Sequence, residues 1–146
     1  MTIKYNRIFA ALDGSSTQDM VARKAVRMAE DHGAELLMGH VVDAVPTEAN
    51  GIDFAALCEA AEGRIREDLA EVLAEAEANP NIPSVDLKVQ VGSIQETIDE
   101  LIEPFNPELI ICGERGLSKI RYVFVGSVST HLIRSADCDV LVVKQH

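Results

Sequence analysis

Short runs of apolar, often β-branched residues recur along the chain and are separated by longer polar segments. The runs span residues 7–12, 35–42, 85–91, 108–112 and 139–144. Four of them are almost continuously apolar, which is typical of strands in a parallel sheet that is covered on both faces. The run 85–91 alternates apolar with polar residues instead, and this alternation predicts a half-exposed strand at an edge of the sheet.

Segments with helical periodicity lie between these strands. They span residues 16–32, 53–78, 94–103 and 127–135. The first stops at His32-Gly33, a helix C-cap signal, and the third begins with Ser93 and Glu96 at the spacing of a capping box. Alternating strands and helices joined by right-handed crossovers predict a three-layer α/β fold, with a mostly parallel, open five-stranded sheet between helices. No repeat or linker interrupts the pattern, so residues 1–146 are expected to form a single domain.

The charge balance limits the classes of partner. The chain has 13 Lys and Arg against 24 Asp and Glu, for a formal net charge of -11, which argues against binding to nucleic acid or to an anionic membrane surface. Much of the acidity falls in 43–79, where a solvated helix face explains it and a partner surface is the alternative. No apolar run approaches the length of a membrane span.

The cysteines and the start of the chain bear on location. Three cysteines with no metal-site spacing, and no apolar secretion signal at the start, lead us to expect a reduced cytoplasmic protein. Cys112 lies inside an apolar run and is expected to pack in the core, although a redox thiol is the functional alternative.

Two of the expected strands lead into segments that suit ligand binding. The first is followed by Asp13-Gly14-Ser15-Ser16, and the fourth by G-E-R-G-L-S-K-I-R-Y-V-F-V-G-S-V-S, which starts at Gly113. In open α/β sheets, ligands bind beyond the carboxyl ends of strands where the strand order reverses. If these two strands are neighbours there, both segments face one crevice.

The residues of the second segment suit phosphate. Glycines let an anion approach backbone N–H groups, and a helix starting at Gly126-Ser127 would offer its free N–H groups and dipole. Arg115, Lys119 and Arg121 add positive charge. Asp13 could accept a hydrogen bond from a sugar or base, or help to hold a divalent cation. Neither the P-loop pattern nor the dinucleotide fingerprint is present.

The segment from Gly113 resembles the G-x2-G-x9-G-[S/T] signature of the universal stress protein family, in its ATP-binding branch. The match extends to I-F-A-A-L-D-G-S-S, L-M-G-H-V-V-D and C-D-V-L-V-V-K, so it covers nearly the whole chain. Two positions depart from the family pattern. Asp139 stands where proline is usual, and Glu114 stands where a small or polar residue is common, which bears on nucleotide affinity.

The resemblance implies a sheet order of 3-2-1-4-5, homodimerisation through strand 139–144, and binding of ATP, with Mg²⁺. Carried over by position, the adenine and ribose pocket would be lined by Ala11, Asp13 and Val41. The phosphates would be wrapped, mainly through backbone N–H groups, by Gly113, Arg115, Gly116, Gly126, Ser127 and Val128. Ser129 would be a further phosphate donor.

The sequence supplies no complete catalytic set, so we expect a nucleotide-dependent regulatory stress-response module with at most slow ATP hydrolysis or autophosphorylation. His40 is interpreted as packing or lining the pocket rather than as a general base. One alternative is a dimeric stress protein that has lost nucleotide binding and acts only through protein partners. A phosphoryl-receiver domain is disfavoured, because the exit of the third strand reads V-Q-V-G-S and lacks an acceptor aspartate.

Overall fold

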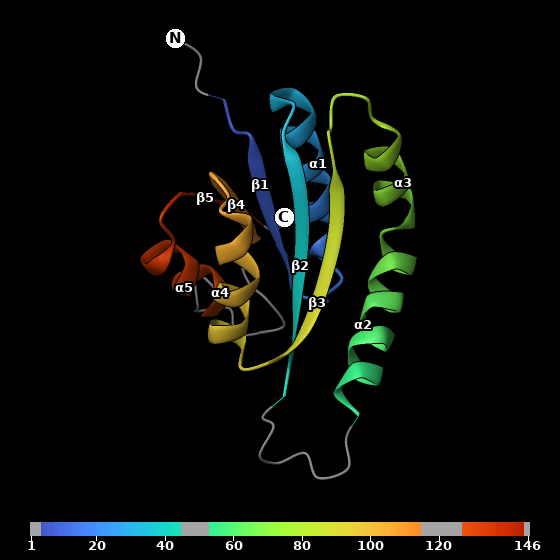
Figure 1. The fold of residues 1–146 in the computed structure, drawn as a ribbon, viewed down its shortest axis with the longest axis vertical. Helices are drawn as coiled ribbons and strands as arrows, with labels where there is room; N and C mark the ends of the chain where they lie inside the picture. Colours follow the sequence, from blue (N-terminus) through green and yellow to red (C-terminus); the bar gives the residue numbers. More distant parts are fainter. Residues whose placement is uncertain (1–3, 45–52, 115–126, 145–146) are drawn as a thin grey trace.

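The computed structural model describes residues 4–44, 53–114 and 127–144, and of Ser127 only the backbone. Its five strands are β1 (Arg7–Leu12), β2 (Glu35–Asp43), β3 (Val85–Gly92), β4 (Leu109–Gly113) and β5 (Asp139–Val143). Its helices are α1 (Gln18–His32), α2 (Phe54–Asp68), α3 (Ala70–Ala78), α4 (Ile94–Phe105) and α5 (Ser127–Ser135). All strand pairs are parallel and the order is β3-β2-β1-β4-β5. The predicted α/β fold, sheet order and edge position of the third strand are confirmed (Figure 1).

The helices form two layers, with α1, α2 and α3 on one face of the sheet and α4 and α5 on the other (Figure 1). Side chains alternate between the two faces along β1. Ile8, Ala10 and Leu12 belong to the core under α1–α3, whereas Phe9 and Ala11 belong to the core under α4 and α5. Because Ile8–Leu12 are buried on both faces of the sheet, this part of the strand is continuously apolar.

The helix expected over 53–78 is two helices, α2 and α3, separated at Leu69. Leu69 has φ −108° and ψ 19°, which lies outside the helical range. It is fully buried and continues the apolar stripe from Ile65 to Val72, so the periodicity gave no sign of the break.

The helix ends agree in part with the sequence signals. Gly33 caps α1 in the left-handed conformation with φ 63°, as its position predicted. The capping box expected at α4 is wrong, because Ser93 occupies the N-cap position without a side-chain capping bond. Ser93 is exposed, so water can bind its hydroxyl in place of the helix N–H groups. Among the described residues, no helix is both long enough and apolar enough to cross a bilayer.

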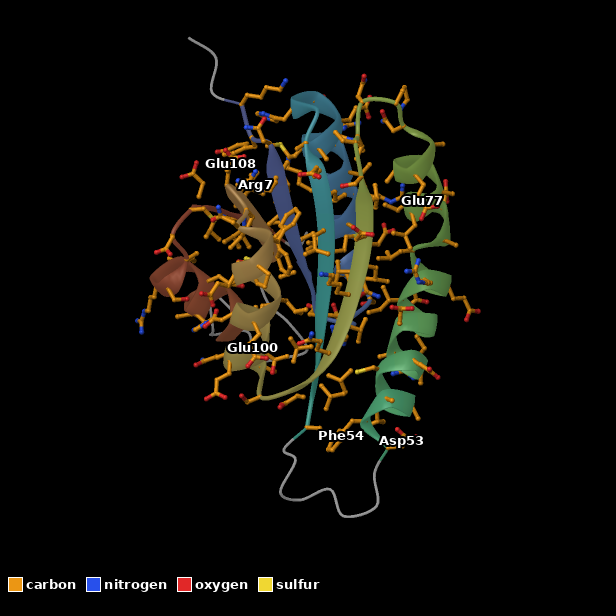
Figure 2. The ribbon with its side chains drawn as sticks, viewed as in Figure 1. Arg7, Asp53, Phe54, Glu77, Glu100 and Glu108 are labelled. Atoms are coloured by element: carbon orange, nitrogen blue, oxygen red, sulfur yellow. The ribbon has the colours of Figure 1, made fainter. Side chains whose placement is uncertain are left out.

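A hydrogen-bonded carboxylate ties the start of β4 to the start of β1. Glu108 Oε1 accepts from the backbone N–H groups of Asn6 and Arg7, at 2.5 and 3.1 Å. Arg7 Nε donates to the carbonyl of Asn106 at 2.9 Å. Arg7 and Glu108 lie at the end of the sheet opposite to Asp53 and Phe54 (Figure 2). The bonds from Asn6 and Arg7, with the charge of Arg7, lower the pKa of Glu108 against the opposing effect of its burial.

This carboxylate makes stability depend on acid. Because its pKa is lowered by folding, Glu108 stabilises the protein above its usual pKa of 4.5, and this stabilisation is lost as the pH falls through the folded value. We expect the free energy of unfolding of Glu108→Gln, measured with urea across that range, to fall less steeply than that of the wild type. Glu77→Gln changes an exposed carboxylate on α3 and serves as the control (Figure 2). Equal slopes for Glu108→Gln and the wild type would contradict this role.

Candidate nucleotide site at the carboxyl edge of the sheet

A cavity of about 640 Å³ lies at the carboxyl edge of the sheet. It spans the ends of β1 and β4. These strands are neighbours in the sheet, although β2, β3 and four helices separate them in the sequence. This is the point of an open α/β sheet where strand order reverses and ligands bind. The volume is in the range of small-molecule and cofactor pockets. The cavity is lined by Ala11, Leu12, Asp13, Gly14, Gln18, His40, Val41, Val42, Asp43, Ala61, Arg64, Ile65, Asp68, Ile94, Ile98, Cys112, Gly113, Val128 and Ser129.

The cavity extends over both faces of the sheet, and we name its two parts by the helices beside them. The α4/α5 lobe is lined by Ala11, Val41, Ile94, Ile98, Cys112, Gly113, Val128 and Ser129. The α1/α2 lobe is lined by Leu12, Gly14, Gln18, His40, Ala61, Arg64, Ile65 and Asp68. His40 and Val41 fall in different lobes because successive side chains of β2 point to opposite faces. Asp13 directly follows β1 and Asp43 is the last residue of β2, and both lie at the boundary between the two lobes.

The β1–α1 connection holds Asp13 through a local hydrogen-bond network. Asp13 Oδ1 accepts from the backbone N–H of Ser15 at 2.9 Å and from its hydroxyl at 2.6 Å. Gly14, between them, has φ 77°, a conformation that a side chain strains. This is the turn geometry that an aspartate followed by glycine favours. It keeps the Asp13 carboxylate at the rim of the cavity.

His40 has a defined tautomer when it is neutral. Its Nδ1 lies 2.9 Å from the carbonyl oxygen of Leu12, which can only accept, so Nδ1 carries the proton. Nε2 is then an acceptor. The ring packs closely over Gly14, where an added Cβ would lie 3.2 Å from Cε1. His40 thus lines the cavity, consistent with its interpretation from the sequence.

The start of α5 is fixed to the end of β4 by a buried serine. Ser129 is 2% exposed, and its hydroxyl donates to the carbonyl of Gly113. Ser129 therefore lies at the cavity as expected, but its proton is directed to the backbone in this structure. Cys112 is buried beside it, and this burial raises the pKa of its thiol despite a smaller opposing effect of Ser129. A raised thiol pKa agrees with the packing role predicted for Cys112.

Six of the expected site residues are fully described by the structure, and they come together. They are Ala11, Asp13, Val41, Gly113, Val128 and Ser129, and each lines the cavity. Ser127 is the first residue of α5. Arg115, Gly116 and Gly126 lie outside the described residues. Glu114 extends the pairing of the last two strands, because its backbone N–H donates to Val143 at 2.9 Å.

Sequence reasoning missed the contribution of α1 and α2 to the cavity, made through Gln18, Ala61, Arg64, Ile65 and Asp68. The stripe of α2 that contains Ala61 and Ile65 identified a buried face, but not the ligand-sized space at its end. Within the part of the chain that the structure describes, no three His, Cys, Asp or Glu side chains group as a metal site.

The fold and the position of this cavity define an α/β protein with a ligand site at its switch point, and comparison with known sequences identifies the family. Residues 4–144 match the family model described as "Universal stress protein family". The chain belongs to the universal stress protein family. A universal stress protein of Staphylococcus epidermidis is 32% identical over 143 residues, covering 97% of this chain and 86% of that protein.

Solved structures agree with this assignment at the level of the fold. Universal stress protein UspA from Lactobacillus plantarum matches with a TM-score of 0.80 and 22% identity over 97% of this chain and 99% of that chain. A universal stress protein in complex with cAMP matches with a TM-score of 0.67 and 22% identity, covering 97% and 98%. One from Archaeoglobus fulgidus in complex with dAMP matches with a TM-score of 0.59 and 16% identity, covering 96% and 98%. Some structural neighbours thus bind adenine nucleotides.

Proposed function

We propose that this chain acts as a single domain that binds ATP, with Mg²⁺, at the carboxyl-edge cavity and responds to it as a regulatory stress-response module. The observation that carries the proposal is the convergence of Ala11, Asp13, Val41, Gly113, Val128 and Ser129 on one cavity. These positions come from four separate segments of the chain. Structural neighbours in complex with cAMP and dAMP support an adenine nucleotide as the ligand class.

The described residues suit the parts of such a ligand. Asp13 can accept hydrogen bonds from ribose hydroxyls, and apolar side chains line the cavity on both sides of it for a planar base. The first turn of an α-helix such as α5 has backbone N–H groups without intrahelical partners and carries the positive end of the helix dipole, and both suit phosphate oxygens. We assign Arg115, Gly116, Gly126 and Ser127 to the same phosphate-binding role. Mg²⁺ would be held mainly by the phosphates and water, with the Asp13 carboxylate as a candidate protein ligand.

The proposed role is binding rather than fast catalysis. Rapid phosphoryl transfer needs a positioned base and positive groups at the terminal phosphate. Among the described cavity residues, Arg64 is the only Lys or Arg side chain, and it lies in the α1/α2 lobe away from α5. We therefore assign no catalytic residue, and propose that any hydrolysis or autophosphorylation is slow. A cytoplasmic location, where ATP is abundant, fits this role.

The proposal is tested by the nucleotide content of the purified protein. The chain has no Trp and only 2 Tyr, so bound adenine would dominate absorbance near 260 nm. Heating should release ATP or ADP, identified by anion-exchange chromatography, and adding Mg-ATP to stripped protein should raise its melting temperature. A clean protein spectrum together with an unchanged melting temperature would overturn the proposal. That result would favour the alternative of a stress protein that acts only through protein partners.

We also propose that the chain forms a homodimer through strand 139–144. The sheet order places β5 at an edge, and among the described residues no strand pairs with its outer side. Val140, Leu141, Val142 and Val143 are each only partly buried. An apolar edge strand of this kind invites pairing with another chain, and a second copy would cover it.

A lysine on this edge should therefore separate the subunits. We expect Val142→Lys to convert a dimer to a monomer in sedimentation equilibrium, because a charge on an edge strand disfavours strand pairing. Val85→Lys makes the same change in β3, the strand at the opposite edge, where the valine is also partly buried. That control should remain dimeric. A wild-type monomer, or a dimer lost equally in both variants, would contradict assembly through β5.

A further inference from the structure

The α1/α2 lobe contains the buried polar side chain of Gln18, which takes no part in the proposed ribose and phosphate contacts. Gln18 is the first residue of α1 and is 3% exposed. Its Oε1 lies 3.2 Å from the backbone nitrogen of Gly14, which donates the bond. Only the oxygen of an amide can accept, so this contact fixes the orientation of the side chain and places its NH₂ group on the opposite branch.

That NH₂ group has no hydrogen-bond acceptor among the described residues of the protein, although it carries two donors. A buried donor without an acceptor is costly, and such groups in folded proteins are generally paired. Because Gln18 lines the cavity, an acceptor can reach it from the ligand space. The protein thus holds a donor in a fixed position, ready for a ligand.

The surroundings of Gln18 favour a neutral, flat acceptor over an anion. Leu12, Ala61 and Ile65 provide apolar walls, and His40 with its proton on Nδ1 presents Nε2 as an acceptor. Among the described residues that line the cavity, the carboxylates at or beside this lobe are Asp13, Asp43 and Asp68, and the one Lys or Arg side chain is Arg64. Their net negative charge would repel a phosphate. A nucleobase fits instead, since its ring nitrogens are acceptors and an exocyclic amino group can donate.

We propose that Gln18 reads the base of the bound nucleotide, with its side-chain NH₂ donating to a ring nitrogen in the α1/α2 lobe. This inference rests on the proposed nucleotide binding and adds a base-contacting residue to it. The phosphates then extend to the α4/α5 lobe, where α5 begins. This places the base on the face of the sheet opposite to Ala11 and Val41, which the family resemblance assigned to the adenine and ribose, and leaves those two residues beside the ribose and phosphates. His40 Nε2 is positioned beside the same lobe to accept from the exocyclic amino group of the base.

The test combines variants of Gln18 with altered bases. Gln18→Glu keeps an oxygen for the N–H of Gly14 but removes the NH₂ donor, and Gln18→Met removes both. We expect each to weaken ATP binding at least about tenfold, and the uncharged Gln18→Met to weaken AMP binding by the same factor as ATP binding, because the contact is to the base. Gln90→Glu adds the same charge at an exposed position on β3 and should bind like the wild type.

Deaza analogues identify the atom that Gln18 contacts. In 1-deaza-, 3-deaza- and 7-deaza-ATP, one ring nitrogen is replaced by C–H. One of the three should bind the wild type about tenfold more weakly than ATP, and should show no such loss in Gln18→Met. Melting curves without nucleotide establish that the variants fold. If Gln18→Met does not fold, the affinity of Gln18→Glu for ATP and the affinities of the wild type for the three analogues test the proposal.

The outcomes separate this inference from the proposed function. Wild-type protein that binds no nucleotide overturns both. If the wild type binds ATP and the Gln18 variants bind it equally well, only the role of Gln18 is overturned. Its NH₂ group would then donate to a buried water. A loss in Gln18→Met that is seen with ATP but absent with AMP also overturns this role of Gln18, because the donor would then contact the outer phosphates.

Discussion

Val128→Glu is expected to reduce ATP affinity at least about a hundredfold. Val128 lies in the first turn of α5 and lines the cavity, where the proposed site places the phosphates. A carboxylate about 5 Å from a phosphate opposes it by about 3 kcal/mol at an effective dielectric constant of about 20. The same charge is compatible with the helix itself, because acidic residues are favourable near helix N-termini. Fluorescence competition with a labelled ATP analogue would measure the loss.

Two controls separate charge from packing. Val128→Gln has nearly the same shape as Val128→Glu without the charge, and should lose much less affinity. Ile133→Glu adds a carboxylate to the same helix at a position that is 53% exposed and outside the cavity lining, and should bind ATP like the wild type. Equal affinity in Val128→Glu and Val128→Gln would place the phosphates elsewhere.

Gly39→Ala is expected to destabilise the protein by about 2 kcal/mol, although it adds one methyl group in a strand. A Cβ at Gly39 would lie 2.5 Å from Cζ of Phe9 and 3.0 Å from its Cε2. Phe9 is fully buried in the core under α4 and α5, so its ring cannot move aside without displacing close-packed neighbours. Urea unfolding gives the change in the free energy of unfolding directly.

The effect of Gly39→Ala should depend on Phe9. In a Phe9→Leu background the ring is gone, and the added methyl should cost much less, which a double-mutant cycle would show as a coupling between the two positions. Gly63→Ala is the matched control, because nothing lies within 4 Å of its Cβ position on α2. That change should stabilise the protein by about 0.5–1 kcal/mol. Additive losses at Gly39 and Phe9 would contradict the steric account.

Much of the fold was predictable because it depends on periodicity. Central strands such as β1 are buried on both faces and read as continuous apolar runs, whereas β3 alternates because it lies at an edge. The strand order came from the family resemblance. The break at Leu69 was not predictable, because Leu69 keeps its place in the buried stripe while its backbone leaves the helical range.

The site was predictable where it follows from strand exits and glycines, as at Asp13 and Gly113. The part formed by tertiary packing was not. Gln18 reads as an ordinary polar residue at the start of a helix, and its burial and fixed amide appear only when α1 is packed on the sheet. Phe9 on β1 packs closely over Gly39 on β2, and neither sequence segment alone indicates this contact.

The central claim is that the carboxyl-edge cavity binds an adenine nucleotide. Titration calorimetry of nucleotide-stripped wild-type protein with Mg-ATP tests it most directly. The expected result is saturable binding of one nucleotide per chain, weakened at least about a hundredfold in Val128→Glu and retained in Ile133→Glu. Absence of saturable heat at two temperatures, with no protection against thermal unfolding at millimolar Mg-ATP, would contradict it.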